Sequence, residues 1–494
     1  MAAIRIEKEE MEAFARASGD VNPVHLPGSP ASDSPFEAPI VYGVLAALAA
    51  VGEVAEERDR GLHGLEATFL RPLRVGVEYD LDVRRDRQRL TACIRDGDLP
   101  ALKLDARFSG GGVLPAVGPA ERLEQPRRCR IEDLAPGASA SGGYAGDEES
   151  IGWLRERFGL GTPTVSDGLL HALLHASYLV GMVMPGSGSL LSRLRVALAG
   201  TAPVATGGGL AAEPLSYRAT VVDLQPEVRT VTLAGDLRRR DELIARLTCE
   251  AHVPPPPAPL DLGLLEKELR RSSGLLQGRT ALVVGGGGRL GAALVHGLAS
   301  QGCSVYTCSR SGAEREVSAR WRGAIHDARG DASDPDHCRR LVRRVVDRHG
   351  GLDLLLCCAA PRLEGIGFGP TSVGRFNDFV QRSVELVSVP MATTIEALEE
   401  KGGTCLVVSS EAVKTMPREW GHYVAAKGAV EALAVWAARR SPGVGVLVAR
   451  VPRLDRETLG GGEDAVAREL VAAWLIRRLS SGLGTGGTHL LEWP

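Results

Sequence analysis

The 494-residue chain lacks the features that would place it in a membrane, a secretory route or a nucleic-acid complex. No apolar run reaches the roughly 18 residues that a membrane-spanning helix needs. The charged N-terminal stretch has no signal-peptide core. The net charge is −3, and basic residues form no clustered face. We therefore expect a cytoplasmic protein without membrane or nucleic-acid partners, and the length indicates about two to four domains.

Metal-ligand spacing is also missing from the nine cysteines. Cys357 and Cys358 form a doublet rather than a C-x-x-C pair, within an apolar run typical of a buried strand. Reduced thiols are the rule in the cytoplasm, so we expect small core residues and no metal. His171 and His175 are four residues apart but have no evident third ligand. A packed or interface pair is therefore favoured over metal ligation.

What is present falls into three blocks, and the second repeats the first. Residues 1–112 predict two helices, at 9–18 and 42–51, and then strands at 65–70, 77–84, 90–95 and 102–108. Residues 113–147 are rich in Pro, Gly, Ala and Ser and predict a linker. In residues 148–253, Asp167-Gly168-Leu-Leu echoes Tyr42-Gly43-Val-Leu before further strands. One apolar helix followed by antiparallel strands outlines a hot-dog fold, so we expect an α+β double hot dog with a degenerate second half.

A proline-rich linker at residues 254–275 leads to the third block, residues 276–494. Strand-like runs there alternate with helical ones. This alternation predicts an α/β Rossmann domain with a doubly wound parallel sheet.

The N-terminal block carries a carboxylate, an amide and an imidazole within six positions: Asp20, Asn22 and His25, around an Asn-Pro turn. Asp20 and His25 could hold a water between them. Adding water to an enoyl thioester, or removing it from a 3-hydroxyacyl thioester, needs such an acid and base. The N–H of Gly43, at the start of the second helix, is placed to stabilise the enolate oxygen. The alternative is that Asp20 only caps a helix and His25 lies on the surface.

Residues 14–25 resemble the signature of the MaoC-like, (R)-specific enoyl hydratase family (hydratase 2), and residues 69–76 resemble its strand after the central helix. The resemblance implies a hot-dog fold, acyl-CoA or acyl-carrier substrates of R configuration, and Asp20 with His25 as the catalytic pair. Tyr42 departs from the family, which usually has a histidine there. The acidic residue that usually follows the catalytic histidine is also missing.

The third block opens with a glycine-rich turn between a strand and a helix, where backbone N–H groups can bind pyrophosphate. The expected cofactor contacts there are Gly285, Gly287, Arg289, Leu290 and Gly291. The next strand ends in Ser309-Arg310. A serine and an arginine at this position suit a 2′-phosphate rather than a ribose hydroxyl, which predicts NADPH.

A second catalytic set lies further on. Ser410 ends a strand, and Tyr423 and Lys427 share one helix face. A lysine cation about 6 Å from the phenol favours phenolate by roughly 3 kcal/mol, or about two pKa units. Tyr423 could then donate a proton to a carbonyl that Ser410 also hydrogen-bonds. A surface Tyr and Lys at helical spacing is the alternative.

Residues 276–494 resemble the short-chain dehydrogenase/reductase family throughout. The resemblance implies a Rossmann fold, NAD(P)H, catalytic Ser410, Tyr423 and Lys427, and an adenine contact at Asp331. The departures from the family are Arg289 in the glycine turn, Cys357-Cys358-Ala359-Ala360 for Asn-Asn-Ala-Gly, Ser383 for the helix asparagine, and Pro452-Arg453 for Pro-Gly.

The two centres suit consecutive steps of fatty-acid or polyketide-type biosynthesis. NADPH would reduce a 3-oxoacyl thioester, and the (3R)-hydroxyacyl product would lose water to give a trans-2-enoyl thioester. No acyl-carrier, ketosynthase or acyltransferase signature is present, so the acyl group would arrive on a separate carrier protein or on CoA. A homodimer is expected by analogy. Two alternatives stay open: an oxidative hydratase/3-hydroxyacyl-CoA dehydrogenase, and a single activity whose other module binds acyl groups or docks a partner.

Overall fold

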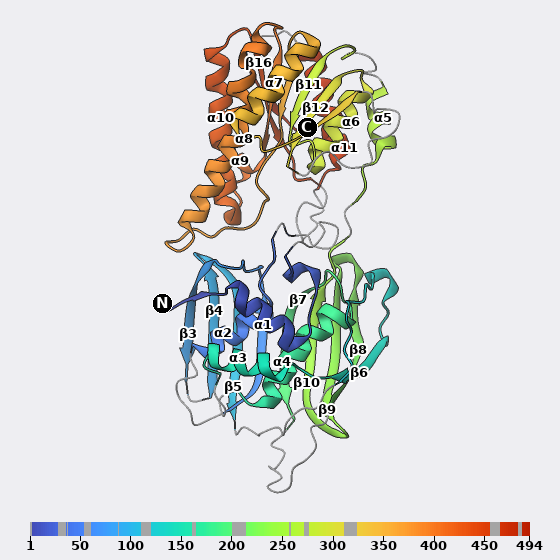
Figure 1. The fold of residues 1–494 in the computed structure, drawn as a ribbon, viewed down its shortest axis with the longest axis vertical. Coiled ribbons are helices and arrows are strands. Elements are labelled where there is room, and N and C mark those ends of the chain that lie inside the picture. The colour runs from blue at the N-terminus through green and yellow to red at the C-terminus, as the bar shows by residue number, and fades with distance from the viewer. Residues whose placement is uncertain are drawn as a thin grey trace. The chain divides into compact units, whose positions relative to one another are not determined.

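The chain folds into two compact units in the computed structural model (Figure 1). Unit 1 comprises residues 1–256 and 367–372, and unit 2 comprises residues 257–366 and 373–494. The structure describes residues 2–27, 36, 38–53, 61–86, 88–109, 120–160, 165–199, 214–255, 258–270, 276–310, 324–454, 465–482 and 487–494. None of the helices in these ranges is both long and apolar enough to span a membrane.

The described strands of unit 1 form one antiparallel sheet in the order β1-β3-β4-β5-β2-β7-β10-β9-β8-β6. They are β1 (Ala2–Arg5), β2 (Gly61–Phe69), β3 (Glu78–Arg85), β4 (Arg89–Asp96), β5 (Leu99–Ser109), β6 (Ser139–Tyr144), β7 (Leu190–Leu198), β8 (Leu215–Gln225), β9 (Thr230–Arg239) and β10 (Glu242–His252). From the central pair β2–β7, the order is β5, β4, β3, β1 on one side and β10, β9, β8, β6 on the other. Each half therefore repeats the same strand order.

The two edge strands of this sheet, β1 and β6, were not predicted. Strand β6 and a short 3-10 turn (Ile131–Asp133) lie inside the expected linker at 113–147. The sequence of β6, SASGGY, has no β-branched residue. It lies at the sheet edge, where β8 is its one neighbour, and an edge strand needs less apolar surface than a central one. Part of the expected linker thus belongs to the sheet. The expected proline-rich linker at 254–275 likewise contains a helix, α5 (Leu262–Leu269).

Unit 2 contains a parallel sheet in the order β13-β12-β11-β14-β15-β16-β17. Its strands are β11 (Thr280–Val284), β12 (Ser304–Ser309), β13 (Ile325–Arg329), β14 (Leu354–Cys357), β15 (Thr404–Ser410), β16 (Gly445–Val451) and β17 (Gly487–Glu492). The order reverses between β11 and β14, which confirms the predicted doubly wound sheet. In such sheets ligands bind beyond the carboxyl ends of the strands at this switch point.

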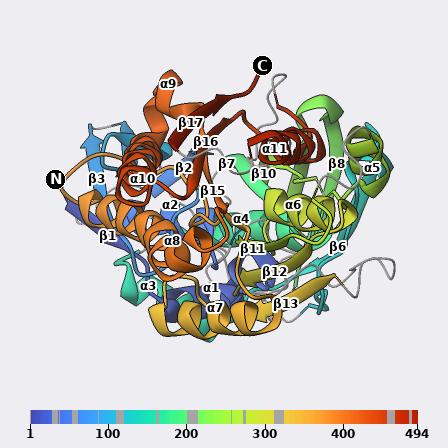
Figure 2. The ribbon, with the colours of Figure 1, turned by 90° about the horizontal axis from the view of Figure 1, so that it is seen from above.

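Helices cover both faces of this parallel sheet (Figure 2). Helices α5, α6 (Arg289–Ser300) and α11 (Arg468–Gly482) share one core cluster. Helices α7 (Pro335–His349), α8 (Val373–Glu399) and α10 (Gly421–Arg440) share the other, and the short α9 (Ala412–Thr415) follows β15. Burial on both faces explains why the central strands are continuous apolar runs.

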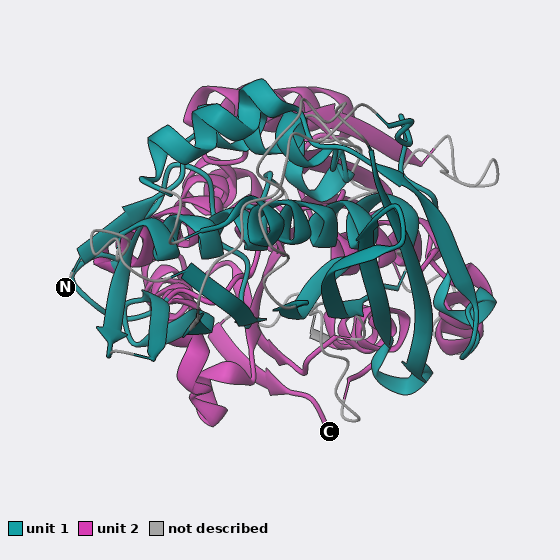
Figure 3. Cartoon of the chain, turned by 90° about the horizontal axis from the view of Figure 1, so that it is seen from below, with its two compact units in different colours: residues 1–256, 367–372 teal, residues 257–366, 373–494 magenta. Residues whose placement is uncertain are grey.

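The short segment at residues 367–372 is assigned to unit 1, although its sequence neighbours on both sides belong to unit 2 (Figure 3). Within unit 1 the Thr371 hydroxyl donates to Asp80, and the Phe368 N–H donates to Asp98.

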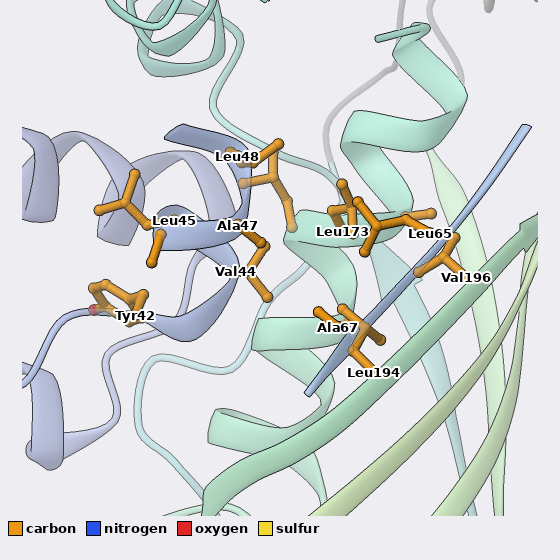
Figure 4. Close-up of a cluster of buried hydrophobic side chains, with 14 of the residues drawn as sticks. Tyr42, Val44, Leu45, Ala47, Leu48, Leu65, Ala67, Leu173, Leu194 and Val196 are labelled. Atoms are coloured by element: carbon orange, nitrogen blue, oxygen red, sulfur yellow. The ribbon is translucent and has the colours of Figure 1, made fainter. Parts of the chain in front are cut away.

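The core of unit 1 surrounds two apolar helices, α2 (Gly43–Gly52) and α4 (Asp167–Tyr178). The other helices of this unit are α1 (Lys8–Ser18) and α3 (Glu148–Arg157). Every residue of α2 from Val44 to Val51 is buried, as expected for a helix that is apolar all round. Figure 4 shows Val44 and Leu48 of α2 facing Leu173 of α4, beside the central strands β2 and β7. Both predicted central helices are therefore present, one in each half.

Candidate active sites

The chain turns sharply just before Asp20. Helix α1 is followed by Gly19, whose φ of 72° is in the left-handed region and whose N–H donates to Ala15. The Asn22 side chain then accepts from the Val24 N–H and caps the 3-10 turn Pro23–His25. Helix end, glycine and Asn-Pro turn together fix the backbone that carries the predicted pair.

The Asp20 carboxylate is buried, and both of its oxygens accept hydrogen bonds. Oδ1 accepts from the Asn22 N–H at 3.0 Å, and Oδ2 accepts from the Ser177 hydroxyl at 2.7 Å. Burial raises the pKa of Asp20 to about 6, although the bonds from Ser177 and Asn22 lower it. Near neutral pH the group is therefore a carboxylate that binds a proton more tightly than an ordinary aspartate.

His25 is a neutral imidazole with a defined tautomer. Its Nδ1 lies 2.8 Å from the Ile40 carbonyl oxygen. A carbonyl can only accept, so Nδ1 carries the hydrogen and Nε2 offers a lone pair. Burial lowers the pKa of this partly exposed ring to about 4, against the bond to Ile40, which raises it. His25 therefore presents a hydrogen-bond acceptor at Nε2.

Tyr42 joins the two members of the pair. Its ring stacks on His25 with centroids 3.8 Å apart, and its hydroxyl donates to the Asp20 main-chain oxygen at 2.7 Å. Burial, and then the charge of Asp20, hold the pKa of Tyr42 well above its usual value, so it remains a hydrogen-bond donor. The residue that departs from the family thus connects Asp20 to His25.

Helix α2 begins at Gly43, and no side chain caps its N-terminus. Uncapped N–H groups at a helix start favour negative charge. A Cβ at Gly43 would lie 2.7 Å from two ring carbons of Phe69, so only glycine fits here without movement of that ring.

The second half of unit 1 encloses Asp20, which the sequence did not reveal. Ser177 lies on α4, and a π-helical turn (Leu179–Val183) follows this helix. A Cβ at Gly181 in that turn would overlap the Asp20 carboxylate. A hydroxyl on a mostly apolar helix was the one available signal for Ser177.

The neighbouring segment is also held by the second half. The Val21 N–H donates to the Met182 sulfur at 3.2 Å. The Asn22 amide donates to the Ser189 carbonyl and accepts from the Gly188 N–H. The predicted catalytic motif of one half is therefore fixed by the helix and loop of the other.

In unit 2 the glycine-rich turn lies between β11 and α6, as predicted. Gly285 has a φ of 89°, and a Cβ there would lie 2.6 Å from the Ala359 nitrogen. A Cβ at Gly291 would overlap the Gly285 carbonyl. Helix α6 starts at Arg289 with Gly288 as its N-cap. Gly287 lies in the same turn, and the Leu290 side chain is buried in the core, so any cofactor contact of Leu290 must come from its backbone.

The end of β12 carries the two residues that were predicted from the sequence to bind a 2′-phosphate. The Ser309 hydroxyl is buried and has no hydrogen-bond partner among the described residues, and Arg310 follows it. The Asp331 carboxylate is already engaged, by the Ser333 hydroxyl at 2.8 Å and by Arg382 at 2.6 Å.

Tyr423 and Lys427 lie on α10, with the Lys427 nitrogen 5.6 Å from the Tyr423 ring centroid. Lys427 is buried and donates to the Val408 carbonyl of β15 at 2.8 Å. At the end of β15 the Ser410 hydroxyl accepts from the Ala412 N–H at 3.2 Å. The Lys427 ammonium is thus fixed beside the Tyr423 ring, as expected for two residues that share a helix face.

Two positions that depart from the family hold weakly polar groups. The Ser383 hydroxyl donates to the Phe379 carbonyl one turn back in α8. The Cys358 thiol donates to the Val284 carbonyl, and burial raises the pKa of Cys358 to about 12, against the charge of Lys427. Cys358 therefore remains a thiol beside the lysine.

Comparisons with known proteins match both units. Residues 1–94 match the MaoC like domain family and residues 279–452 the short chain dehydrogenase family. The (R)-specific enoyl-CoA hydratase of Aeromonas caviae is 32% identical over 120 residues, which cover 24% of this chain and 84% of that protein.

The matches to the second unit cover less of the relatives or are more remote. An Uncharacterized oxidoreductase of Thermotoga maritima is 34% identical over 90 residues, 17% of this chain and only 35% of that protein's length. A solved short-chain dehydrogenase/reductase from Serratia marcescens BCRC 10948 has 23% identity, covers 44% of this chain and 97% of its own, and gives a TM-score of 0.37. The chain belongs to the MaoC-like (R)-specific enoyl hydratase family through its N-terminal residues and carries a short-chain dehydrogenase/reductase domain after them.

Proposed function

We propose that this chain is a bifunctional enzyme of fatty-acid or polyketide-type biosynthesis. It reduces a 3-oxoacyl thioester with NADPH and dehydrates the (3R)-hydroxyacyl product to a trans-2-enoyl thioester. The observation that carries the proposal is that Tyr42, which precedes an uncapped helix, stacks on the neutral imidazole of His25 and hydrogen-bonds the main chain of Asp20, whose carboxylate is buried. The repeated strand order of unit 1 supports a double hot dog around this site.

In the reduction, Tyr423 donates its phenolic proton to the carbonyl oxygen at C3. Lys427 stabilises the resulting phenolate, and Ser410 hydrogen-bonds the same oxygen. The glycine turn would hold the pyrophosphate of the cofactor, with Ser309 and Arg310 at the 2′-phosphate. NADPH, when bound, supplies the hydride. The product is an alcohol at C3.

In the dehydration, the Asp20 carboxylate removes a proton from C2. The thioester oxygen gains negative charge, which the N–H of Gly43 stabilises; one such donor is worth about 3 to 4 kcal/mol. His25 Nε2 accepts a hydrogen bond from the C3 hydroxyl and orients it. Asp20 then returns its proton to that hydroxyl as the C3–O bond breaks, so water leaves and the carboxylate is restored.

The substrate thioester would be carried by a separate acyl carrier protein or by CoA. The Aeromonas relative is named for a CoA thioester of R configuration, and this supports the stereochemistry proposed here. A cytoplasmic homodimer is part of the proposal. The reductive direction depends on a preference for NADPH, since cells keep that pool reduced.

The proposal is tested by incubating the protein with a 3-oxoacyl-CoA and NADPH and following the acyl group by mass spectrometry. We expect a gain of two hydrogens and then the loss of one water. Asp20→Asn should stop at the 3-hydroxyacyl stage. Tyr423→Phe should leave the 3-oxoacyl thioester unreduced but still dehydrate an added (3R)-hydroxyacyl thioester.

Each variant serves as the control for the other, because each should keep one step intact. Unchanged ketone reduction by Tyr423→Phe would remove Tyr423 from the mechanism. A clear preference for NAD⁺, with oxidation of the 3-hydroxyacyl thioester, would instead support the oxidative hydratase/dehydrogenase. Loss of reduction in the unaltered protein would leave unit 2 as a binding module.

A further inference from the structure

The Asp20 carboxylate belongs to the first half of unit 1, but its surroundings belong to the second. The Ser177 hydroxyl reaches Oδ2 from α4 at 2.7 Å. The π-helical turn after α4 then places Gly181 against the same carboxylate, where no side chain would fit. Single π-helical turns are frequent at functional sites. The half without an Asp-Asn-His motif therefore forms one wall of the site.

The direction of the Ser177 hydroxyl is unusual for a serine in a helix. Helical serines commonly donate to the carbonyl four residues back. Ser18 does so to Phe14, and Ser383 does so to Phe379. Ser177 donates to Asp20, 157 residues away. It also lies among apolar residues of α4, so the hydroxyl has a buried partner rather than solvent.

A hydroxyl can do what the other donor to Asp20 cannot. The Asn22 N–H only donates, so it stabilises the ionised carboxylate alone. Ser177 can donate to the carboxylate and, after rotation, accept from the protonated acid. A buried acid that changes its protonation state needs such a partner, because otherwise one state leaves a buried polar atom unpaired.

We propose that Ser177 is a positioning residue of the dehydration site, which holds Asp20 Oδ2 and exchanges donor for acceptor when Asp20 takes up and returns the substrate proton. The inference rests on the proposed function. It makes the second half of unit 1 part of the catalytic apparatus.

The proton balance is simple. With Asp20 ionised, Ser177 donates to it while the carboxylate removes the C2 proton. The proton stays on Asp20 until the C3 hydroxyl takes it and leaves as water. Ser177 itself neither gains nor loses a proton over the cycle. Its effect is on the proton affinity of Asp20, which its hydrogen bond lowers.

The test compares Ser177→Ala and Ser177→Thr with the unaltered full chain. The measurement is the pH dependence of kcat/KM for dehydration of a (3R)-hydroxyacyl-CoA. Ser177→Ala should move the acid limb, which begins near pH 6, upward by about one pH unit and lower the plateau about tenfold, as expected for the loss of one hydrogen bond to a charged group. Ser177→Thr keeps a hydroxyl and should restore most of both.

Ser166→Ala is the matched control. Ser166 is a buried serine that caps the same helix, and its hydroxyl accepts from the Leu169 N–H. Its loss should weaken α4 without moving the acid limb. An unchanged limb and plateau in Ser177→Ala, or an equal shift in Ser166→Ala, overturns the proposal.

A second readout needs no turnover. Proteins labelled with ¹³C at the aspartate carboxyls are titrated by NMR, with Asp20→Asn used to assign the signal. The Asp20 resonance should titrate near pH 6 in the unaltered chain and about one unit higher in Ser177→Ala. An unshifted titration refutes the inference even where dehydration fails, whereas absent dehydration with a shifted titration refutes the proposed function alone.

Discussion

At the scale of single residues, the buried Asp20 carboxylate, which the proposed chemistry needs, lowers the stability of unit 1. Asp20 is 2% exposed, and burial raises its pKa from 3.8 to about 6. The folded protein therefore binds the Asp20 proton more tightly than the unfolded chain does. The contribution of Asp20 to the free energy of unfolding is most favourable below about pH 4 and is lost as the pH rises through about 6. The ionised form at neutral pH then costs about 3 kcal/mol of folding free energy.

Asp20→Asn should therefore stabilise the protein while it abolishes dehydration. The neutral amide avoids the burial of charge, and its NH₂ can donate to the Ser177 hydroxyl. We expect a gain in unfolding free energy of about 2 to 3 kcal/mol near pH 8 that falls as the pH drops and disappears below about pH 3, where the aspartate is protonated in both states. Urea unfolding at several pH values measures it. Asp223→Asn, at an exposed position of the same unit, is the control, and a gain that does not depend on pH would contradict the argument.

At the scale of elements, helix α4 carries two buried histidines that the proposed reaction does not use. His175 is completely buried, among the rings of Tyr144, Tyr178 and Tyr217. Neither of its ring nitrogens has a hydrogen-bond partner among the described residues. Burial lowers the pKa of His175 to about 3. The packed histidine pair favoured from the sequence agrees with this environment at His175.

This histidine should make unit 1 sensitive to acid. The pKa of His175 in the folded protein lies below the unfolded value of 6.5. Protonation of this histidine therefore does not reduce the free energy of unfolding above pH 6.5, but reduces it progressively as the pH falls below that value. The loss from His175 alone is about 2 kcal/mol between pH 7 and pH 5. His175→Phe should stabilise unit 1 at pH 5 more than at pH 7, which unfolding by circular dichroism can measure. His63→Phe, a partly exposed histidine on β2, should change neither value in that way.

Turns set by neighbouring residues were predictable from the sequence, whereas contacts between distant segments were not. The Asp20–His25 turn was predictable because its geometry is local: a glycine, an asparagine and a proline set the backbone within six residues. The Gly285–Gly291 turn was predictable for the same reason. Ser177 was not, because its contact with Asp20 spans 157 residues and depends on how two halves pack. Strand β6 was missed because its place at the sheet edge, rather than its composition, makes it a strand.

At the scale of the whole molecule, the reacting groups of each proposed step come from one unit. Asp20, His25, Tyr42 and Ser177 belong to unit 1, and Ser410, Tyr423 and Lys427 belong to unit 2. Each unit is compact in its own right and has its own core clusters. The two proposed steps therefore share the (3R)-hydroxyacyl intermediate but no reacting side chain, and a substitution in one unit should leave the other step intact.

This separation predicts that the two half-active variants complement each other in solution. Asp20→Asn should reduce a 3-oxoacyl-CoA and release the (3R)-hydroxyacyl thioester, and Tyr423→Phe should dehydrate it. A mixture of the two should form the enoyl product after a lag, at a rate that rises with the concentration of Tyr423→Phe, as followed by mass spectrometry. Each variant alone, at the same total concentration, is the control. If the mixture stops at the hydroxyacyl stage although both single steps are intact, the intermediate must pass within one chain. Joining the two activities in one chain would then serve to transfer the intermediate between the two sites, rather than only to produce both enzymes together.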